Sequence, residues 1–201
     1  MKKYLVLSVF FTAIALSSCS SYVKYSYKLC EIEYDGKKDF KVQEIIVPSK
    51  VDDEPRNVSE KTNVYYYSNT LFDTYWTIAE RGFIFVLENK TKAPIIIAKE
   101  QICYVNIEGY TEGVVEDIQF SSDIIIPGGA KYKGVIKPKS RAHNDIPLIP
   151  TYVNDYDTTK KYIEENIIGK NLSVMMPIKT NNKDCIYTFI FKVTGAEIPT
   201  L

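Results

Sequence analysis

The sequence predicts an all-β fold of antiparallel strands with one short helix near residues 158–168. Short runs of β-branched and aromatic residues recur from Phe40 onward, and Gly, Pro, Asn or Asp separate them. Within these runs, apolar residues recur with the period of two that places them on one face of a strand. Many short strands at this spacing are typical of an antiparallel sandwich or barrel.

Two segments show the strand pattern best. In GFIFVL, residues 82–87, both alternating faces are largely apolar, which predicts a central strand. Residues 185–193 alternate an aromatic and apolar set with a more polar set, which predicts a half-buried strand. Further strands are predicted at 41–47, 63–67, 72–78, 94–98, 101–107, 131–136, 146–149 and 172–178, and a turn is predicted at Asn89-Lys90-Thr91.

One segment has a helical pattern instead. Asp157 is placed to cap a helix that runs from Thr158 to Ile168, and Gly169 follows as a stop signal. Ile163 and Ile167 are four residues apart and so share one face. We expect a short helix that crosses one end of the β domain.

The N-terminus has the order of a secretory signal. Lys2 and Lys3 precede an uncharged run of thirteen residues, YLVLSVFFTAIAL, and two serines follow it. At about 1.5 Å of rise per residue, this run is too short to cross about 30 Å of hydrocarbon as a helix. We therefore expect residues 1–18 to be a signal peptide that is removed.

The end of this run carries a second signal. Leu16-Ser17-Ser18-Cys19 resembles the lipobox of bacterial lipoproteins, in which an apolar residue and two small residues precede a cysteine. The resemblance implies that Cys19 becomes the mature N-terminus and carries a thioether diacylglycerol and an amide-linked acyl chain, such as palmitate. Several acyl chains hold a domain firmly at a bilayer, whereas one is marginal. The predicted partner is thus a lipid bilayer.

The expected organisation has three parts: the signal peptide at 1–18, a lipidated N-terminus with a tether or first strand at 19–40, and the β domain at 41–201. Without the signal, 23 basic residues stand against 25 acidic ones, a formal charge of −2. This balance gives no electrostatic reason to expect a nucleic-acid partner.

Three longer stretches, GFIFVLENKTKAPIII, IKPKSRAHNDIPLIP and YTFIFKV, widen the resemblance. Their order is similar to that of exported Bacteroidota lipoproteins of unassigned function that have an immunoglobulin-like β-sandwich. The resemblance covers roughly residues 63–193, and it implies that fold but no catalytic residue. In such lipoproteins, acidic residues just after the acylated cysteine favour surface display. Here the first acid is Glu31, which favours an outer-membrane protein that faces the periplasm and leaves surface display open.

Catalytic and metal-binding motifs are weak. The one histidine, His143, has Ser140 and Asp145 near it in sequence, but neighbours along a loop do not converge as a hydrolase triad requires. Residues 154–157, Asn-Asp-Tyr-Asp, alternate oxygen ligands but lack the glycine and glutamate of a calcium loop. No phosphate-loop spacing is present. We predict no enzyme, no cofactor and no metal. The carboxylates at 52–54, at 155 and 157, and at 164–165 keep a carboxylate-dependent hydrolase as a further alternative.

Aromatic residues offer the main alternative function. Exposed tyrosines and tryptophans stack on sugars and anchor interfaces. A carbohydrate-binding or adhesive module could use residues of two predicted strands, namely Tyr65, Tyr66, Tyr67, Tyr75 and Trp76. The protein or glycan partner itself is not specified by the sequence.

Two further observations concern modification. Asp157-Thr158-Thr159 resembles the acceptor for O-glycosylation of exported Bacteroidota proteins, which makes Thr158 a candidate, although helix capping competes for these residues. Beyond Cys19, the chain has Cys30, Cys103 and Cys185, which allow one disulfide with a thiol left over or three separate thiols.

Overall fold

The computed structural model describes residues 22–48, 61–115, 123–141, 146–180 and 183–199, so the predicted signal peptide and Cys19 lie outside it. The described residues form thirteen strands, one α-helix and two short 3₁₀ helices. The elements are β1 (Lys24–Tyr34), β2 (Lys37–Asp39), β3 (Gln43–Pro48), β4 (Lys61–Ser68), β5 (Phe72–Ala79), β6 (Gly82–Asn89), β7 (Ile95–Ile97), η1 (Lys99–Gln101), β8 (Cys103–Val105), β9 (Thr111–Val115), β10 (Ile124–Ile126), β11 (Lys131–Pro138), η2 (Lys139–Arg141), α2 (Tyr156–Asn166), β12 (Asn171–Lys179) and β13 (Asp184–Glu197).

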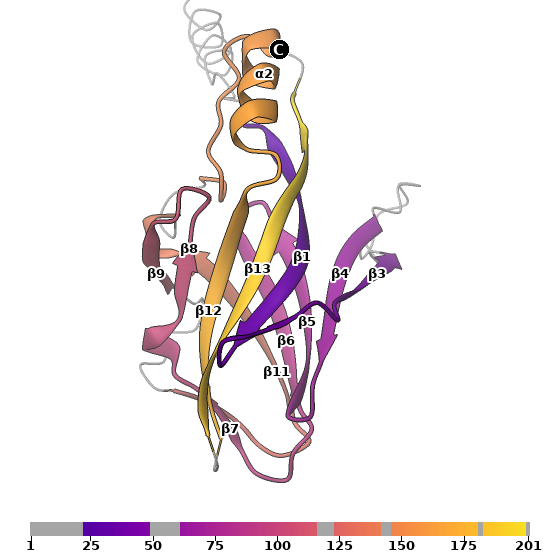
Figure 1. Cartoon of the computed structure of the whole chain (residues 1–201), viewed down its shortest axis with the longest axis vertical. Coiled ribbons are helices and arrows are strands. Elements are labelled where there is room, and N and C mark those ends of the chain that lie inside the picture. The colour runs from indigo at the N-terminus through magenta and orange to yellow at the C-terminus, as the bar shows by residue number, and fades with distance from the viewer. Residues whose placement is uncertain (1–21, 49–60, 116–122, 142–145, 181–182, 200–201) are drawn as a thin grey trace, which may run out of the picture.

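The strands form one continuous sheet that folds back on itself. Its order is β2-β1-β13-β12-β8-β9-β11-β6-β5-β4-β3, and β7 joins it through β12 and also pairs with β10. Each pairing among the described strands is antiparallel. In Figure 1, β12, β13 and β1 lie in front of β11, β6 and β5, while β8 and β9 run along one side. The prediction of a mostly antiparallel all-β fold with one short helix is confirmed.

Aromatic side chains fill the space between the two layers. Trp76 of β5 is fully buried, and its ring lies 4.5 Å from that of Phe189 and 5.6 Å from that of Phe191, both on β13. On its own layer, Trp76 stacks on Phe85 of β6 at 5.2 Å. Large rings bury much apolar surface, so this cluster joins the layers and contributes strongly to stability.

Most of the predicted strands are present with shifted ends. The segment at 146–149 is not a strand, which corrects the prediction. Leu148 and Ile149 are buried there, and the Leu148 N–H donates to the carbonyl of Glu80 at 2.8 Å. Pro147 and Pro150 flank these residues, and proline has no N–H for a ladder, so an apolar run is buried here without strand pairing.

The first strand begins close to the N-terminal end of the described chain. β1 pairs with β13 along most of its length, from Lys24 opposite Glu197 to Tyr34 opposite Tyr187. Leu29 and Ile32 on β1 are fully buried. The segment that the sequence left open as a tether or first strand therefore contributes a strand, and the sheet begins before residue 41.

The turn after β6 depends on one buried amide. The Asn89 side chain is fully buried and donates to the carbonyls of Ala93, Ile126 and Pro127 at 2.8, 2.9 and 3.2 Å. Its oxygen accepts from the Thr91 N–H and hydroxyl at 2.9 and 2.8 Å. The Asn-Lys-Thr turn predicted from the sequence thus ties three backbone segments together through its first residue.

The helix begins two residues earlier than predicted. α2 spans Tyr156–Asn166, and the cap is Asp155, whose carboxylate accepts from the Thr158 N–H at 2.8 Å. Asp157, the predicted cap, lies in the first turn instead. Ile163 and Ile167 are buried on one face as expected, and Gly169 has the positive φ of 85° that suits glycine after a helix. Among the described residues, no helix is long and apolar enough to cross a membrane.

Candidate functional site

The five aromatic residues proposed as a ligand platform divide between two faces. Tyr65, Tyr67 and Trp76 point into the core and are at most 2% exposed. These three cannot form a surface platform, which corrects that expectation. Tyr66 and Tyr75 point outward, as strand alternation requires, and their half-buried rings lie opposite each other with centroids 5.0 Å apart. The outer face keeps one tyrosine pair, without the tryptophan.

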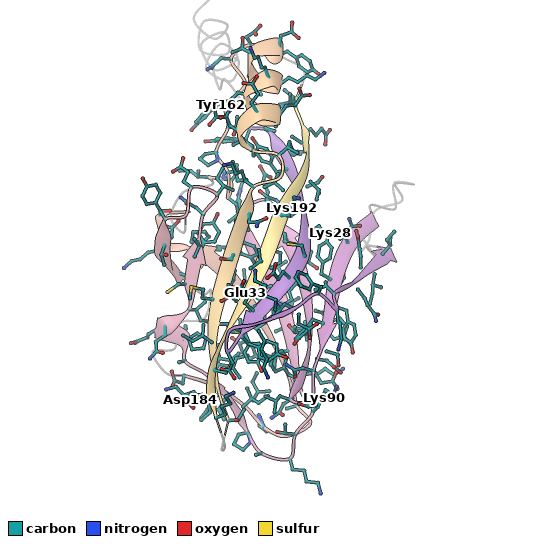
Figure 2. All side chains as sticks on the ribbon, in the orientation of Figure 1. Lys28, Glu33, Lys90, Tyr162, Asp184 and Lys192 are labelled. Carbon is teal, nitrogen blue, oxygen red and sulfur yellow. The ribbon has the colours of Figure 1, made fainter. Side chains whose placement is uncertain are left out.

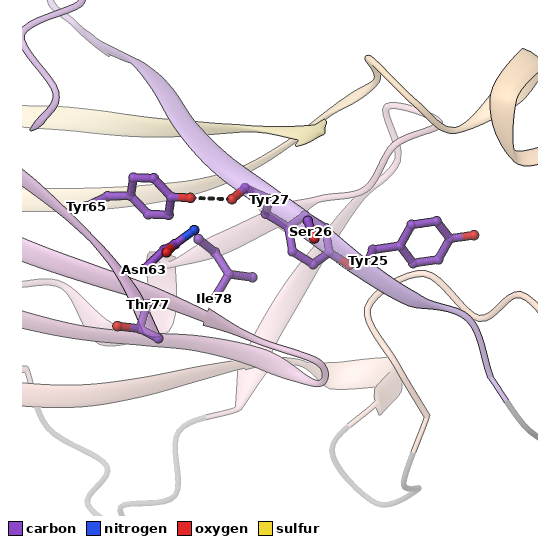
Figure 3. Close-up of a pocket in the computed structure, with 7 residues that line it drawn as sticks. All are labelled: Tyr25, Ser26, Tyr27, Asn63, Tyr65, Thr77 and Ile78. Atoms are coloured by element: carbon purple, nitrogen blue, oxygen red, sulfur yellow. Dashed lines mark hydrogen bonds between the residues drawn. The ribbon is translucent and has the colours of Figure 1, made fainter. Parts of the chain in front are cut away.

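A cleft opens where the two ends of the folded sheet approach each other. β1 and β4 are not paired with each other, and the Tyr65 hydroxyl of β4 donates to the Tyr27 carbonyl of β1 at 2.5 Å, as Figure 3 shows. We call the adjacent cavity of about 240 Å³ the seam cleft. It is lined by Tyr25, Ser26, Tyr27, Asn63, Tyr65, Thr77 and Ile78.

The seam cleft is polar and uncharged. Burial raises the pKa values of Tyr25, Tyr27 and Tyr65, so these phenols stay protonated at neutral pH. The Tyr25 and Tyr65 hydroxyls already donate to the Thr151 hydroxyl and the Tyr27 carbonyl. The exposed side chains of Ser26 and Asn63 are therefore the neutral donors and acceptors that the lining offers. Such a lining can hydrogen-bond to a polar ligand or to an extended peptide, and it contains no group poised to take a proton at neutral pH.

A larger cavity lies beside α2 at the end of the molecule where β1 begins. We call it the α2 groove; it encloses about 400 Å³ between the helix and residues 150–155. Tyr152 and Tyr162 contribute its aromatic lining, and Thr158 its hydroxyl. Figure 2 shows Tyr162 at the side of α2, at the end of the molecule opposite Asp184.

Contacts from the N-terminal end of β1 build this region. The hydroxyls of Tyr22 and Tyr152 are 2.6 Å apart, and their ring centroids are 4.6 Å apart. The Val23 N–H donates to the Thr151 carbonyl at 3.1 Å, and the Tyr25 hydroxyl donates to the Thr151 hydroxyl at 2.7 Å. The start of the described chain is therefore fixed against the segment that leads into α2.

Asp155, a carboxylate that lines the α2 groove, caps the helix. The Thr158 N–H donates to Asp155 and lowers the pKa of that carboxyl, so Asp155 stays ionised as the helix cap. Within the described part of the chain, no group of three or more His, Cys, Asp or Glu side chains is arranged to hold a metal ion. Asp157, Glu164 and Glu165 are exposed on α2. The carboxylates at 52–54, as well as His143 and Asp145, lie outside the described residues.

The candidate modification site and the cysteines are accessible to different degrees. Thr158 is exposed, whereas its neighbour Thr159 is buried against the domain. Cys30, Cys103 and Cys185 are separate thiols, each half-buried. Burial raises the pKa values of Cys30 and Cys185, which keeps both as thiols at neutral pH.

Sequence reasoning did not find Tyr152 and Tyr162 as site residues. Tyr162 precedes the buried Ile163, and this position on the helix places it beside the packed face, which is a usable signal. Tyr152 has no comparable signal, because its partner Tyr22 is 130 residues away in sequence.

Comparison with known proteins adds no relative. Models of known protein families, curated proteins and solved structures were searched, and none matches this chain.

Proposed function

We propose that this protein is an exported lipoprotein, acylated at Cys19 and held at the outer membrane on the periplasmic side. The observation that carries the proposal is Leu16-Ser17-Ser18-Cys19 at the end of a thirteen-residue apolar run that follows two lysines. The charge, the run length and the small residues before the cysteine agree with one another. Acyl chains on Cys19 would be enough to hold the protein at the membrane, without any contribution from the β domain.

The path of the chain supports this anchor. Tyr22, three residues after Cys19, already contacts Tyr152, and β1 pairs with β13 from Lys24 onward. The described domain therefore begins immediately after the proposed acylation site, at a surface end of the molecule. A cysteine at that position could reach a bilayer without any unfolding of β1.

For the β domain, we propose a non-catalytic binding or envelope-structural role and an immunoglobulin-like sandwich as its architecture. Two antiparallel layers packed around Trp76 support the sandwich. The exposed hydroxyl of Ser26 and amide of Asn63 in the seam cleft support binding without turnover, because such groups hold a polar partner but do not exchange protons with it at neutral pH.

Replacement of Cys19 tests the anchor. Cys19→Ala should abolish incorporation of labelled palmitate and move the protein from the membrane fraction to the soluble fraction. Cys103→Ser is the matched control, since Cys103 lies within the β domain on β8, and this variant should stay labelled and membrane-bound. Persistent labelling of Cys19→Ala would show that the lipobox interpretation is wrong.

Site-specific crosslinking in intact envelopes tests the binding role. A photo-crosslinking residue at Asn63, in the seam cleft, should give one stoichiometric adduct with an envelope protein, whereas the same residue at the exposed Ile125 should not. If both positions give the same adducts, or neither gives any, the seam cleft is not the binding surface.

A further inference from the structure

We propose that the end of the molecule formed by α2 and the segment at 150–155 lies against the lipid bilayer, with Tyr152, Tyr156 and Tyr162 in the headgroup region. This inference rests on the proposed acylation of Cys19 and adds a specific orientation to it. We call this end the α2 face. The occupant is the membrane surface itself, in contrast to a soluble glycan or a second protein.

Covalent geometry sets the distance. Whatever its conformation, a separation of three residues spans at most about 11 Å. Tyr22 is held against the α2 face by its contact with Tyr152 and by the adjacent bond from the Val23 N–H to Thr151. If Cys19 is acylated, its acyl chains therefore enter the bilayer within about 11 Å of Tyr22. The opposite end of the molecule, where Lys179 of β12 pairs with Asp184 of β13, lies one strand length away from the α2 face (Figure 1).

The side chains of the α2 face suit an interface. Tyr152, Tyr156 and Tyr162 are 51%, 49% and 50% exposed, although tyrosine is large and mostly apolar. Tyrosine has a ring that prefers lipid and a hydroxyl that prefers water, and it is enriched at the headgroup level of membranes. Tyr152 and Tyr162 also line the α2 groove, so the apolar surface there is continuous from the helix to the preceding segment.

Charged side chains contribute less to the proposed membrane contact than the aromatic rings do. The helix exposes both signs, and the charged residues are Asp157, Lys160, Lys161, Glu164 and Glu165. A mixed set of this kind neither attracts nor repels an anionic surface strongly. We therefore expect the contact to depend on the aromatic rings and to be nearly insensitive to salt.

Fluorescence quenching in vesicles tests this orientation. The acylated full-length chain is reconstituted into phosphatidylcholine vesicles that contain brominated acyl chains, which quench nearby tryptophan. Tyr162→Trp and Tyr152→Trp add a reporter at the α2 face. Ile186→Trp is the matched control, because Ile186 is 51% exposed, as Tyr152 is, but lies near the start of β13 at the opposite end of the molecule. Trp76 is buried in every variant and gives a constant background.

We expect the added emission at positions 152 and 162 to fall about twofold in brominated vesicles, and the emission at position 186 to stay nearly unchanged. Raising the salt concentration should leave this difference in place. Equal melting temperatures of the three variants would show that each is folded.

The alternatives give different results. Palmitate labelling and flotation with vesicles, but no quenching at 152 and 162, would overturn the orientation and leave the lipid anchor intact. Absence of labelling in the unsubstituted protein would overturn both. Quenching that disappears at high salt would show a charge-driven contact and contradict the aromatic one. A soluble oligosaccharide that shifts the emission of Tyr162→Trp without vesicles would instead assign the groove to a glycan.

Discussion

The two layers of the core and the α2 face use aromatic residues in opposite ways. Between the layers, Trp76 is fully buried among Phe85, Phe189 and Phe191. At the α2 face, Tyr156 and Tyr162 leave about half of their surface exposed, 49% and 50% respectively. Tyrosine also occurs in the core, where Tyr67 is fully buried, so residue type does not decide where an aromatic side chain acts. Its place on a strand or helix, and what packs over that place, decide it.

The largest expected effect comes from a substitution in the buried aromatic cluster. Trp76→Ala should lower the free energy of unfolding by about 3–5 kcal/mol, because it leaves a cavity between the layers. Tyr156→Ala, the exposed counterpart, should change it by less than about 0.5 kcal/mol. Urea unfolding of both variants measures the difference.

Trp76→Phe tests whether the ring contacts account for the loss of stability in Trp76→Ala. It should cost less than Trp76→Ala, because phenylalanine keeps most ring contacts and removes the indole N–H, which has no hydrogen-bond partner among the described residues. Equal losses for Trp76→Ala and Tyr156→Ala would contradict the assignment of Trp76 to the core.

A second pair of matched residues separates buried from exposed amides. Asn89→Ala should destabilise the protein by about 2–3 kcal/mol, because three carbonyls lose a donor in a site closed to water. Asn106 caps an exposed turn by accepting from the Glu108 and Tyr110 N–H groups, so Asn106→Ala should cost about 0.5–1 kcal/mol. Thermal and urea unfolding of the two variants would show the order, and a larger loss at Asn106 would contradict it.

The smallest expected effect concerns the helix cap. Asp155→Ala should lower the melting temperature by about 2–4 °C at pH 7, while Asp157→Ala should hardly change it. Because folding depresses the pKa of Asp155, its contribution is present above the usual value of 3.8 and is lost as the pH falls through the lower folded value.

The difference in melting temperature between wild type and Asp155→Ala should therefore shrink below about pH 4. Calorimetry across this range provides the measurement. A difference that grows in acid, or an equal effect of Asp157→Ala, would show that Asp155 is not the cap.

Much of the fold could be predicted because strand alternation is a local property. The run at 82–87 became β6, and the segment at 185–193 became the longer β13, since their apolar periodicity depends on neighbouring residues alone. The run at 146–149 is as apolar as a strand but does not form one, because Pro147 and Pro150 lack the N–H that strand pairing requires. The cap moved from Asp157 to Asp155 because helix ends depend on one or two hydrogen bonds.

The candidate site could be predicted far less well. Alternation alone indicates that Tyr65 and Tyr67 share a face opposite to that of Tyr66, but it does not say which face is buried. The layer that packs on β4 and β5 buries Tyr65, Tyr67 and Trp76 and thereby removes the expected platform. The two cavities join residues far apart in sequence, such as Tyr27 with Tyr65, and no local pattern reports such contacts.

By itself, the sequence determined an antiparallel β fold, the turn at Asn89 and a helix near Ile163, because alternation, turn chemistry and helical spacing are set within a few residues. Only the tertiary structure decided that β1 belongs to the sheet, that Trp76 is core and that Tyr152 and Tyr162 share a groove. Those outcomes follow from pairing and packing between distant segments, which depend on the whole chain.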